Sequence, residues 1–293
     1  MREMENAINP KKTASVDKEK IVRIALCVLK YIIMVLSVVM VILPLIPVLF
    51  GSLKGTNEYL TSSALALPTE WKFENYLTAL VDGNMLLGFG NTMFIMVVSL
   101  AVSVITGSMT AYILQRFKFR GSKIIKSLFL IAALMPAVTN NIALFQIMSA
   151  LDLFNTYWAG ILLFSGTDII SVYIFIQFID NVSASIDESA MIDGASYPRI
   201  FFTLILPLLL PAIATVLIIK GVSIYNDFTT PFLFMPDSDL AMLSTSLYNF
   251  QGASSQWEIV CAGIIIITVP MLIIFLALQK WIYSGLAVGS VKE

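Results

Sequence analysis

Two charged residues lie within long apolar segments of this chain, and they are its first candidates for chemistry. Asp168 is the only charge between residues 153 and 179, and Lys220 follows an uncharged run over residues 200–219. A charge at membrane depth is costly and usually marks a transport path or a paired site. At 1.5 Å per helical residue, the two lie at depths that differ by about 6–8 Å, within reach of a lysine side chain.

Tyr225 and Asn226 follow Lys220 in the sequence and add an aromatic ring and an amide, the two kinds of group that hold a sugar. Each of these polar residues has a plainer interpretation as well. It can form hydrogen bonds between helices, and Lys220 can extend toward the membrane surface. Both interpretations stay open here. The predicted candidates for a substrate path are Asp168, Lys220, Tyr225 and Asn226.

The residue types that support catalysis or metal binding are scarce. The chain has no histidine, and its two cysteines, Cys27 and Cys261, both lie in apolar surroundings. Histidine is the commonest metal ligand and general base. The phosphate-binding pattern G-x-x-x-x-G-K-[ST] is absent as well. We therefore expect no catalytic site, no metal site and no cofactor in this chain, and its net charge of −1 gives no basis for a nucleic acid partner.

A polar stretch, ESAMIDGASYP, interrupts the apolar chain at residues 188–198. We interpret Ser185 and Glu188 as a capping box at the start of a short helix. Gly194 is expected at the end of that helix, where glycine adopts positive φ without penalty. Pro198 suits the first turn of a second helix. The segment is either a simple connector at the membrane surface or a docking element for a cytoplasmic partner.

The composition indicates a membrane protein. The chain is 58% hydrophobic and 13% charged, whereas soluble proteins carry about 25% charged residues. About 20 apolar residues cross the hydrocarbon layer as a helix, so the charge-free runs predict an all-α integral membrane protein with six spans. The spans are residues 28–50, 89–112, 127–150, 157–179, 203–226 and 259–279. Residues 1–23 form a polar tail, with the first 20 expected to be disordered, and residues 24–293 form the transmembrane domain.

Lysine and arginine are distributed unevenly between the two sides that these spans define. Fifteen fall in the N-terminal part up to and including Lys30, the loops after spans two and four, and the C-terminal end, whereas only Lys54 and Lys72 fall on the other side. Cytoplasmic loops carry the excess of these residues. Both termini and the ESAMIDGASYP segment are therefore expected in the cytoplasm.

The same polar segment resembles a known signature. Glu188-Ser189-Ala190, three residues, Gly194, nine residues and Leu204-Ile205-Leu206-Pro207 are similar to the E-A-A, G, I-x-L-P loop of bacterial ABC importer permeases. Ser189 stands where that family usually has alanine, and Leu204 where it usually has isoleucine. AYILQRFKFRG at 111–121 and YNDFTTPFLF at 225–234 also resemble the sugar-importer permeases. The pattern is most similar to the smaller, six-span permease of maltose-type oligosaccharide transporters.

This resemblance implies a transport subunit and not an enzyme. It implies that the chain forms half of the path for a sugar, expected to be an oligosaccharide, beside a second homologous permease in the bacterial inner membrane. A dimer of separate ABC ATPase chains would bind ATP and Mg and drive transport. An extracytoplasmic sugar-binding protein would deliver the sugar.

The resemblance also implies two contact regions. In that family the signature loop contains a coupling helix that sits in a cleft of the ATPase. The coupling residues implied here are Glu188, Ser189, Ala190, Asp193, Gly194, Ala195 and Pro207. The outer loop after span five would contact the binding protein through Ser244, Tyr248, Gln251 and Gly252. Pro207 and Pro211 are either bend points at the foot of span five or ordinary membrane-helix prolines.

Two other functions stay open. The first is an importer permease of the same kind for a sugar acid or a glycerophosphodiester. Asp168 mildly disfavours this function because its carboxylate repels an anion, but Lys220 weakens that argument. The second is an ATP-independent secondary transporter. Such transporters often show repeated halves and usually have more spans than the six predicted here.

Overall fold

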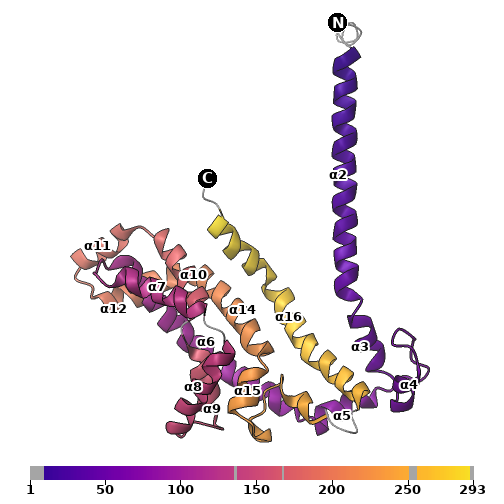
Figure 1. The fold of residues 1–293 in the computed structure, drawn as a ribbon. Helices are drawn as coiled ribbons and strands as arrows, with labels where there is room; N and C mark the ends of the chain where they lie inside the picture. The colour runs from indigo at the N-terminus through magenta and orange to yellow at the C-terminus, as the bar shows by residue number, and fades with distance from the viewer. Residues whose placement is uncertain (1–9, 135–136, 167, 251–255, 291–293) are drawn as a thin grey trace.

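The computed structural model describes residues 10–134, 137–166, 168–250 and 256–290, and every regular element within these ranges is helical (Figure 1). The prediction of an all-α chain is confirmed for this part of the protein. A bundle built around α6, α9, α10, α14 and α16 forms most of the fold, and α2 stands apart from it (Figure 1).

The first apolar span consists of α2 (Pro10–Ile42) and α3 (Leu45–Gly51). No residue of its most apolar stretch, which falls within Val22–Gly51, is buried by the rest of the chain. The expected disorder of the first 20 residues is wrong from Pro10 onward, because α2 begins there. Proline suits the first turn of a helix, and no further proline or glycine follows before residue 44.

Two short helices, α4 (Thr56–Thr61) and α5 (Glu74–Asp82), connect the first span to the bundle. Lys54 is buried in this segment, and its ammonium group donates hydrogen bonds of 2.8 Å to the Ser62 hydroxyl and to the Ser63 carbonyl. The Asn75 amide donates to the Lys54 carbonyl at 2.8 Å. The segment is therefore folded against the end of the first span.

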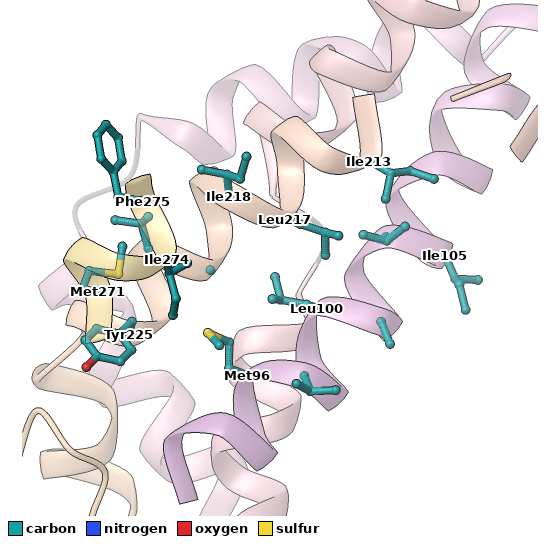
Figure 2. Close-up of a pocket in the computed structure, with 15 residues that line it drawn as sticks. Met96, Leu100, Ile105, Ile213, Leu217, Ile218, Tyr225, Met271, Ile274 and Phe275 are labelled. Atoms are coloured by element: carbon teal, nitrogen blue, oxygen red, sulfur yellow. The ribbon is translucent and has the colours of Figure 1, made fainter. Parts of the chain in front are cut away.

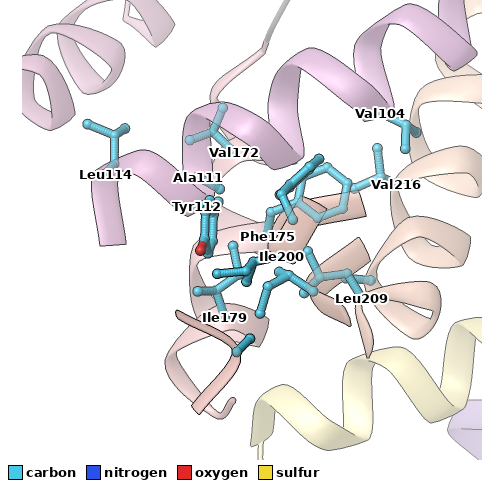
Figure 3. Packing of buried hydrophobic residues seen from close by; sticks show 14 residues of the cluster. Val104, Ala111, Tyr112, Leu114, Val172, Phe175, Ile179, Ile200, Leu209 and Val216 are labelled. Atoms are coloured by element: carbon cyan, nitrogen blue, oxygen red, sulfur yellow. The ribbon is translucent and has the colours of Figure 1, made fainter. Parts of the chain in front are cut away.

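The long helix α6 (Met85–Arg116) packs against α9, α10 and α14. Its buried face and the facing side of α10 build a cluster that contains Val104, Ala111 and Phe175 (Figure 3). α7 (Ser122–Ala133) and α8 (Ala137–Ala150) occupy the predicted third span, and residues 135–136 between them lie outside the described part of the chain.

Spans four and five are bent. The fourth consists of α9 (Tyr157–Ser165) and α10 (Ile169–Asp180), whose axes differ by 44°. The fifth is bent by 74° between Tyr197–Leu208 and Leu210–Asn226. Its elements, after α11 (Ala184–Ile192), are α12 (Tyr197–Ile200), a π-helical turn η1 (Phe201–Ile205), α13 (Leu206–Leu208) and α14 (Leu210–Asn226).

The bend in span five has an identifiable cause. Leu209 separates α13 from α14, and Pro207 and Pro211 flank it. Each proline lacks the N–H that an uninterrupted helix needs, and π-helical turns such as η1 locally widen the helix. Of the two interpretations of these prolines, the bend point is therefore the one that the structure supports.

The C-terminal part consists of α15 (Thr229–Phe234), the 3₁₀ turns η2 (Ser238–Leu240) and η3 (Ser246–Phe250), and α16 (Trp257–Ser290). α16 packs against α3, α5 and α14. The start of α2 and the end of α16 lie toward the side of the molecule that carries α11, whereas α4, α5 and α15 lie at the opposite end (Figure 1).

Three helices of the described chain are long and apolar enough to cross a membrane, and up to five spans result if each bent pair counts as one. They are Val22–Gly51, Met85–Arg116 and Trp257–Ala277, with spans four and five as the bent pairs. The chain is therefore built as a multi-pass membrane protein, and the count of six spans stays a prediction.

Candidate functional site

Asp168 and Lys220 meet at the break between α9 and α10. The Lys220 Nζ lies 3.1 Å from Asp168 Oδ2, which confirms that the two predicted charges pair. Asp168 caps the start of α10, because its Oδ1 accepts a 2.8 Å hydrogen bond from the Ser171 backbone N–H. Its Oδ2 also accepts a 2.8 Å bond from the Ser171 hydroxyl. The prediction placed Asp168 in the middle of a continuous span, whereas the structure places it where the span is interrupted.

The carbonyl groups at the end of α9 find partners on neighbouring helices. Lys220 donates to the Gly166 carbonyl, and Ser103 of α6 donates to the Ser165 carbonyl at 3.0 Å. Ser99 of α6 donates to the Ile161 carbonyl at 3.2 Å. The end of a helix leaves carbonyls without intrahelical partners, and this end favours a cation while a helix start favours an anion. The lysine and the aspartate thus stand at the matching ends of the two half-helices.

The exposure of the pair is unequal. The Lys220 side chain is 12% exposed and the Asp168 side chain 41% exposed. A partly exposed carboxylate is unfavourable against lipid at membrane depth. The exposed charge of this site is therefore negative.

The other two path candidates do not join this pair. Tyr225 is 1% exposed, and its hydroxyl donates to the Ile267 carbonyl of α16 at 2.8 Å. Asn226 is exposed at the end of α14, and its amide donates to the Val222 carbonyl of its own helix at 3.0 Å. The structure thus uses the Tyr225 hydroxyl to hold α16 and leaves Asn226 accessible.

A groove of about 570 Å³ lies between α6, α14 and α16. Figure 2 shows the aliphatic side chains that form its walls, among them Leu100 of α6, Leu217 of α14 and Ile274 of α16. The Tyr225 ring lines one end. A sugar needs hydrogen-bonding groups around it, so the chemistry of this groove does not suit one.

The ESAMIDGASYP segment forms a helix, a glycine turn and a second helix, as predicted. The start of the first helix differs from the prediction. Ser183, not Ser185, is the N-cap of α11, and its Oγ accepts from the Ser185 backbone N–H at 3.3 Å. Ser185 is the second residue of α11, so Glu188 is too far along the helix to complete a capping box and is exposed instead.

The end of α11 is a Schellman motif. Gly194 has φ +80°, which confirms the expected positive φ. The Ala195 N–H donates to the Ala190 carbonyl at 2.9 Å, and the Gly194 N–H donates to the Met191 carbonyl at 3.0 Å. These are the two bonds that define the motif. Pro198 lies in the first turn of α12, as predicted.

The predicted coupling residues differ in accessibility. Glu188, Ser189, Asp193 and Gly194 are exposed, whereas Ala190 packs into the cluster of Figure 3. Ala195 packs against the same cluster from its edge. Pro207 lies in α13, beyond η1 and next to the bend. α11 therefore offers a polar outer face and fixes itself to the bundle through small apolar residues.

The sequence interpretation missed the residues that hold α11 to the bundle. The Arg116 Nε lies 2.7 Å from Asp187 Oδ2, and the Tyr112 hydroxyl donates to Asp187 Oδ1 at 3.0 Å. In the sequence, Arg116 counts only as one of the cytoplasmic charges after span two, and nothing there identifies a partner for Asp187. The one signal that pointed to them was the presence of Tyr112 and Arg116 in the AYILQRFKFRG stretch.

The predicted outer contact residues are only partly within the described chain. Ser244 is half-buried, and its hydroxyl donates to the Asp227 carbonyl at 2.7 Å. Tyr248 is exposed and packs edge-on against Phe232, with 5.0 Å between ring centroids. Gln251 and Gly252 lie outside the described residues.

Comparison with protein families matches residues 103–288 to the binding-protein-dependent transport system inner membrane component family. The match covers more than half of the 293 residues. The chain belongs to this family. It is a transport permease subunit and not an enzyme, and in such systems a separate subunit provides the ATPase.

Individual relatives agree with the family. The permease is 31% identical to the melibiose/raffinose/stachyose import permease protein MelC of Bacillus subtilis, over 85% of this chain and 91% of the relative. It is 31% identical to the galactooligosaccharides transport system permease protein GanQ of the same organism, over 89% and 94%. A crystal structure of a bacterial ABC transporter for the import of alginate contains a chain of the same fold, with a TM-score of 0.75, 20% identity, and coverage of 87% and 96%.

The positive φ of Gly194 leads to a testable requirement: transport should need a residue at this position that tolerates that conformation. Gly194→Val should abolish transport while the protein still inserts, because a β-branched residue at φ +80° costs at least about 1–2 kcal/mol. An added Cβ meets no atom within 4 Å, so the effect comes from the backbone alone. Gly194→Asn is the matched control, since asparagine tolerates this conformation. Uptake at the wild-type rate by the valine variant, at equal expression, would refute the requirement.

The Asp168–Lys220 ion pair leads to a second prediction, which concerns assembly. Lys220→Met leaves Asp168 without its cation, at a cost of about 2.5–3.5 kcal/mol for a charge at a helix centre. The double variant Lys220→Met/Asp168→Asn should therefore assemble better than Lys220→Met alone. The measurement is the yield of permease that co-purifies with its partner chains. Additive losses in the double variant would show that the two side chains do not stabilise each other.

Proposed function

We propose that this permease forms half of the membrane path of an ATP-driven importer for a neutral oligosaccharide. It would work beside a second homologous permease in the bacterial inner membrane. An ABC ATPase dimer would bind ATP and Mg, and an extracytoplasmic binding protein would supply the sugar. The single observation that carries the proposal is the folded coupling segment, α11, Gly194 and α12, whose polar face is exposed in a chain of this family.

The proposed arrangement has six spans, with residues 24–293 as the transmembrane domain and residues 1–23 as a cytoplasmic tail. Both termini and α11 are cytoplasmic in this proposal. The uneven distribution of lysine and arginine supports it. The placement of the start of α2, the end of α16 and α11 toward one side also supports it (Figure 1).

Glu188, Ser189, Asp193 and Gly194 are proposed to contact the ATPase, with Ala190 and Ala195 as the packing side of the segment. The bend at Leu209 and Pro207 would then carry the displacement of the segment into α14. Ser244, Tyr248, Gln251 and Gly252 are proposed as contacts for the binding protein. The exposed aromatic side chain of Tyr248 suits such a contact.

The charge of the path favours a neutral sugar over an anionic one. Asp168 is the more exposed member of the pair, and Lys220 is largely buried behind it. A sugar acid or a glycerophosphodiester would meet a carboxylate there. Relatives named for melibiose, raffinose, stachyose and galactooligosaccharides support the same choice. Asn226 is proposed as a further path residue, whereas the Tyr225 hydroxyl is already bonded to Ile267. Membership of the family argues against an ATP-independent secondary transporter.

The substrate class is tested with the purified complex. The permease, its partner permease, its ATPase and its binding protein are assembled in lipid, and ATP turnover is measured with raffinose, stachyose and an oligogalacturonate. A neutral oligosaccharide should raise turnover, and the oligogalacturonate should not. Stimulation by the oligogalacturonate alone would overturn the choice of a neutral sugar.

The topology is tested by labelling. Asn57→Cys and Ser189→Cys are introduced separately into a Cys27→Ala/Cys261→Ala background, since both positions are exposed. A membrane-impermeant thiol reagent added to intact cells should label only position 57. Labelling of position 189 in intact cells, with labelling of both positions in permeabilised cells as the control, would reverse the orientation.

A further inference from the structure

The C-terminal end of α6 and the coupling helix α11 are joined by three polar contacts. Arg116 Nε lies 2.7 Å from Asp187 Oδ2, and the Tyr112 hydroxyl donates to Asp187 Oδ1 at 3.0 Å. The Arg116 guanidinium also donates to the Val182 carbonyl, just before α11, at 2.6 Å. We refer to Arg116, Asp187 and Tyr112 as the clamp.

The clamp is buried. The side chains of Arg116 and Asp187 are 15% and 7% exposed. The Tyr112 ring packs 5.5 Å from the ring of Phe201 in η1, and Phe117 packs 5.0 Å from Tyr197 in α12. The ion pair thus borders a layer of aromatic side chains to which α6, α12 and η1 all contribute.

A buried ion pair of this kind is weak as a source of stability. Apolar residues of similar volume often replace such pairs without loss, whereas removal of one partner leaves a buried charge and is strongly destabilising. What the clamp adds is a fixed geometry. It joins residues 75 positions apart in the sequence, so it sets how α11 sits on α6 independently of the chain between them.

The chain offers only a bent route from α11 to α14. It turns at Gly194, widens at η1 and bends by 74° at Leu209. α6 is different, because it is one unbroken helix of 32 residues that packs against α9, α10 and α14. A displacement of α11 that reaches α6 directly would therefore reach three neighbours through one rigid element.

We infer that the clamp makes α11 and the C-terminal end of α6 move as one body, so that ATP-driven displacement of α11 passes sideways into α6. Arg116, Asp187 and Tyr112 are positioning residues in this inference, which rests on the proposed coupling function of α11. Ser103, whose hydroxyl bonds to the carbonyl at the break of span four, lies 13 residues before Arg116. At 1.5 Å per residue that is about 20 Å along a single helix, so α6 links the clamp to the Asp168–Lys220 site.

The test measures two distances between nitroxide labels in the assembled complex, each with and without MgATP and vanadate. Labels at Ser185 and Lys118 report on α11 against the end of α6, and labels at Ser185 and Ala277 report on α11 against α16. All three positions are exposed. The labels are placed in the Cys27→Ala/Cys261→Ala background.

In the permease with an intact clamp, MgATP and vanadate should shift the 185–277 distance and leave the 185–118 distance unchanged. In the double variant Arg116→Met/Asp187→Leu, which replaces the ion pair by apolar side chains, the 185–118 distance should shift as well. A 185–118 distance that stays fixed in the double variant would overturn the inference, and so would one that shifts in the intact protein. An unchanged 185–277 distance in the intact complex would instead refute the coupling role of α11.

Two further variants keep the test decisive. Tyr112→Phe retains the ring contact with Phe201 and loses only the hydrogen bond to Asp187. It should broaden the 185–118 distribution under MgATP and vanadate, and a distribution as narrow as that of the wild type would contradict the inference if the double variant does not assemble. Asp180→Ala is the matched control. It removes an exposed 2.7 Å hydrogen bond that Gln115 of α6 donates to Asp180, so both distances should behave as in the wild type.

Discussion

The fold depends on the satisfaction of backbone polar groups where helices are interrupted inside the membrane. Hydrocarbon offers no hydrogen-bonding partner, so a broken span persists only if neighbouring groups take the freed carbonyls and N–H groups. The break in span four meets this condition for several of its groups. Ser99 and Ser103 take carbonyls of α9, Lys220 takes that of Gly166, and Asp168 takes the N–H of Ser171. Because Ser99 and Ser103 come from α6 and Lys220 from α14, the break itself fixes how the three spans sit together.

The same condition separates the roles of the two charges. Lys220 is largely buried because it completes the end of α9, and its position follows from that structural task. Asp168 caps α10 with one oxygen, shares the other with Ser171 and Lys220, and still exposes part of its surface. A group that completes the backbone and yet faces outward is well placed to meet a solute without loss of the fold. The local structure thus explains why the carboxylate, and not the ammonium group, is the more exposed of the two charges.

Sequence reasoning succeeded where the determining interactions are local. Gly194 and Pro198 were predicted correctly, because positive φ and a missing N–H are properties of single residues. The Asp168–Lys220 pair was also predictable, since the rise per helical residue places both at similar depth. The N-cap of α11 was misplaced by two residues because Ser183 and Ser185 both suit it. Local chemistry did not distinguish between them.

Interactions between distant segments were beyond the sequence pattern. Tyr225 was a candidate for sugar contact or for a hydrogen bond between helices, and its hydroxyl bonds to the Ile267 carbonyl of α16, 42 residues away. Arg116 was interpreted only as a topology signal, although its guanidinium is committed to Asp187 and to the Val182 carbonyl. In each case the partner became known only when the packing of the helices was known.

These contacts give α6 a role that its apolar sequence does not reveal. Its C-terminal end holds α11 through Arg116 and Tyr112, and its middle holds the break of span four through Ser99 and Ser103. All four side chains lie on one unbroken helix, so their spacing is fixed by the helical rise. Span five reaches the break of span four through Lys220, which pairs with Asp168, but it is bent at Leu209. The unbroken helix α6 and the bent span five therefore both reach the Asp168–Lys220 site. A displacement of α6 relative to span five would act directly on the contact between these two side chains.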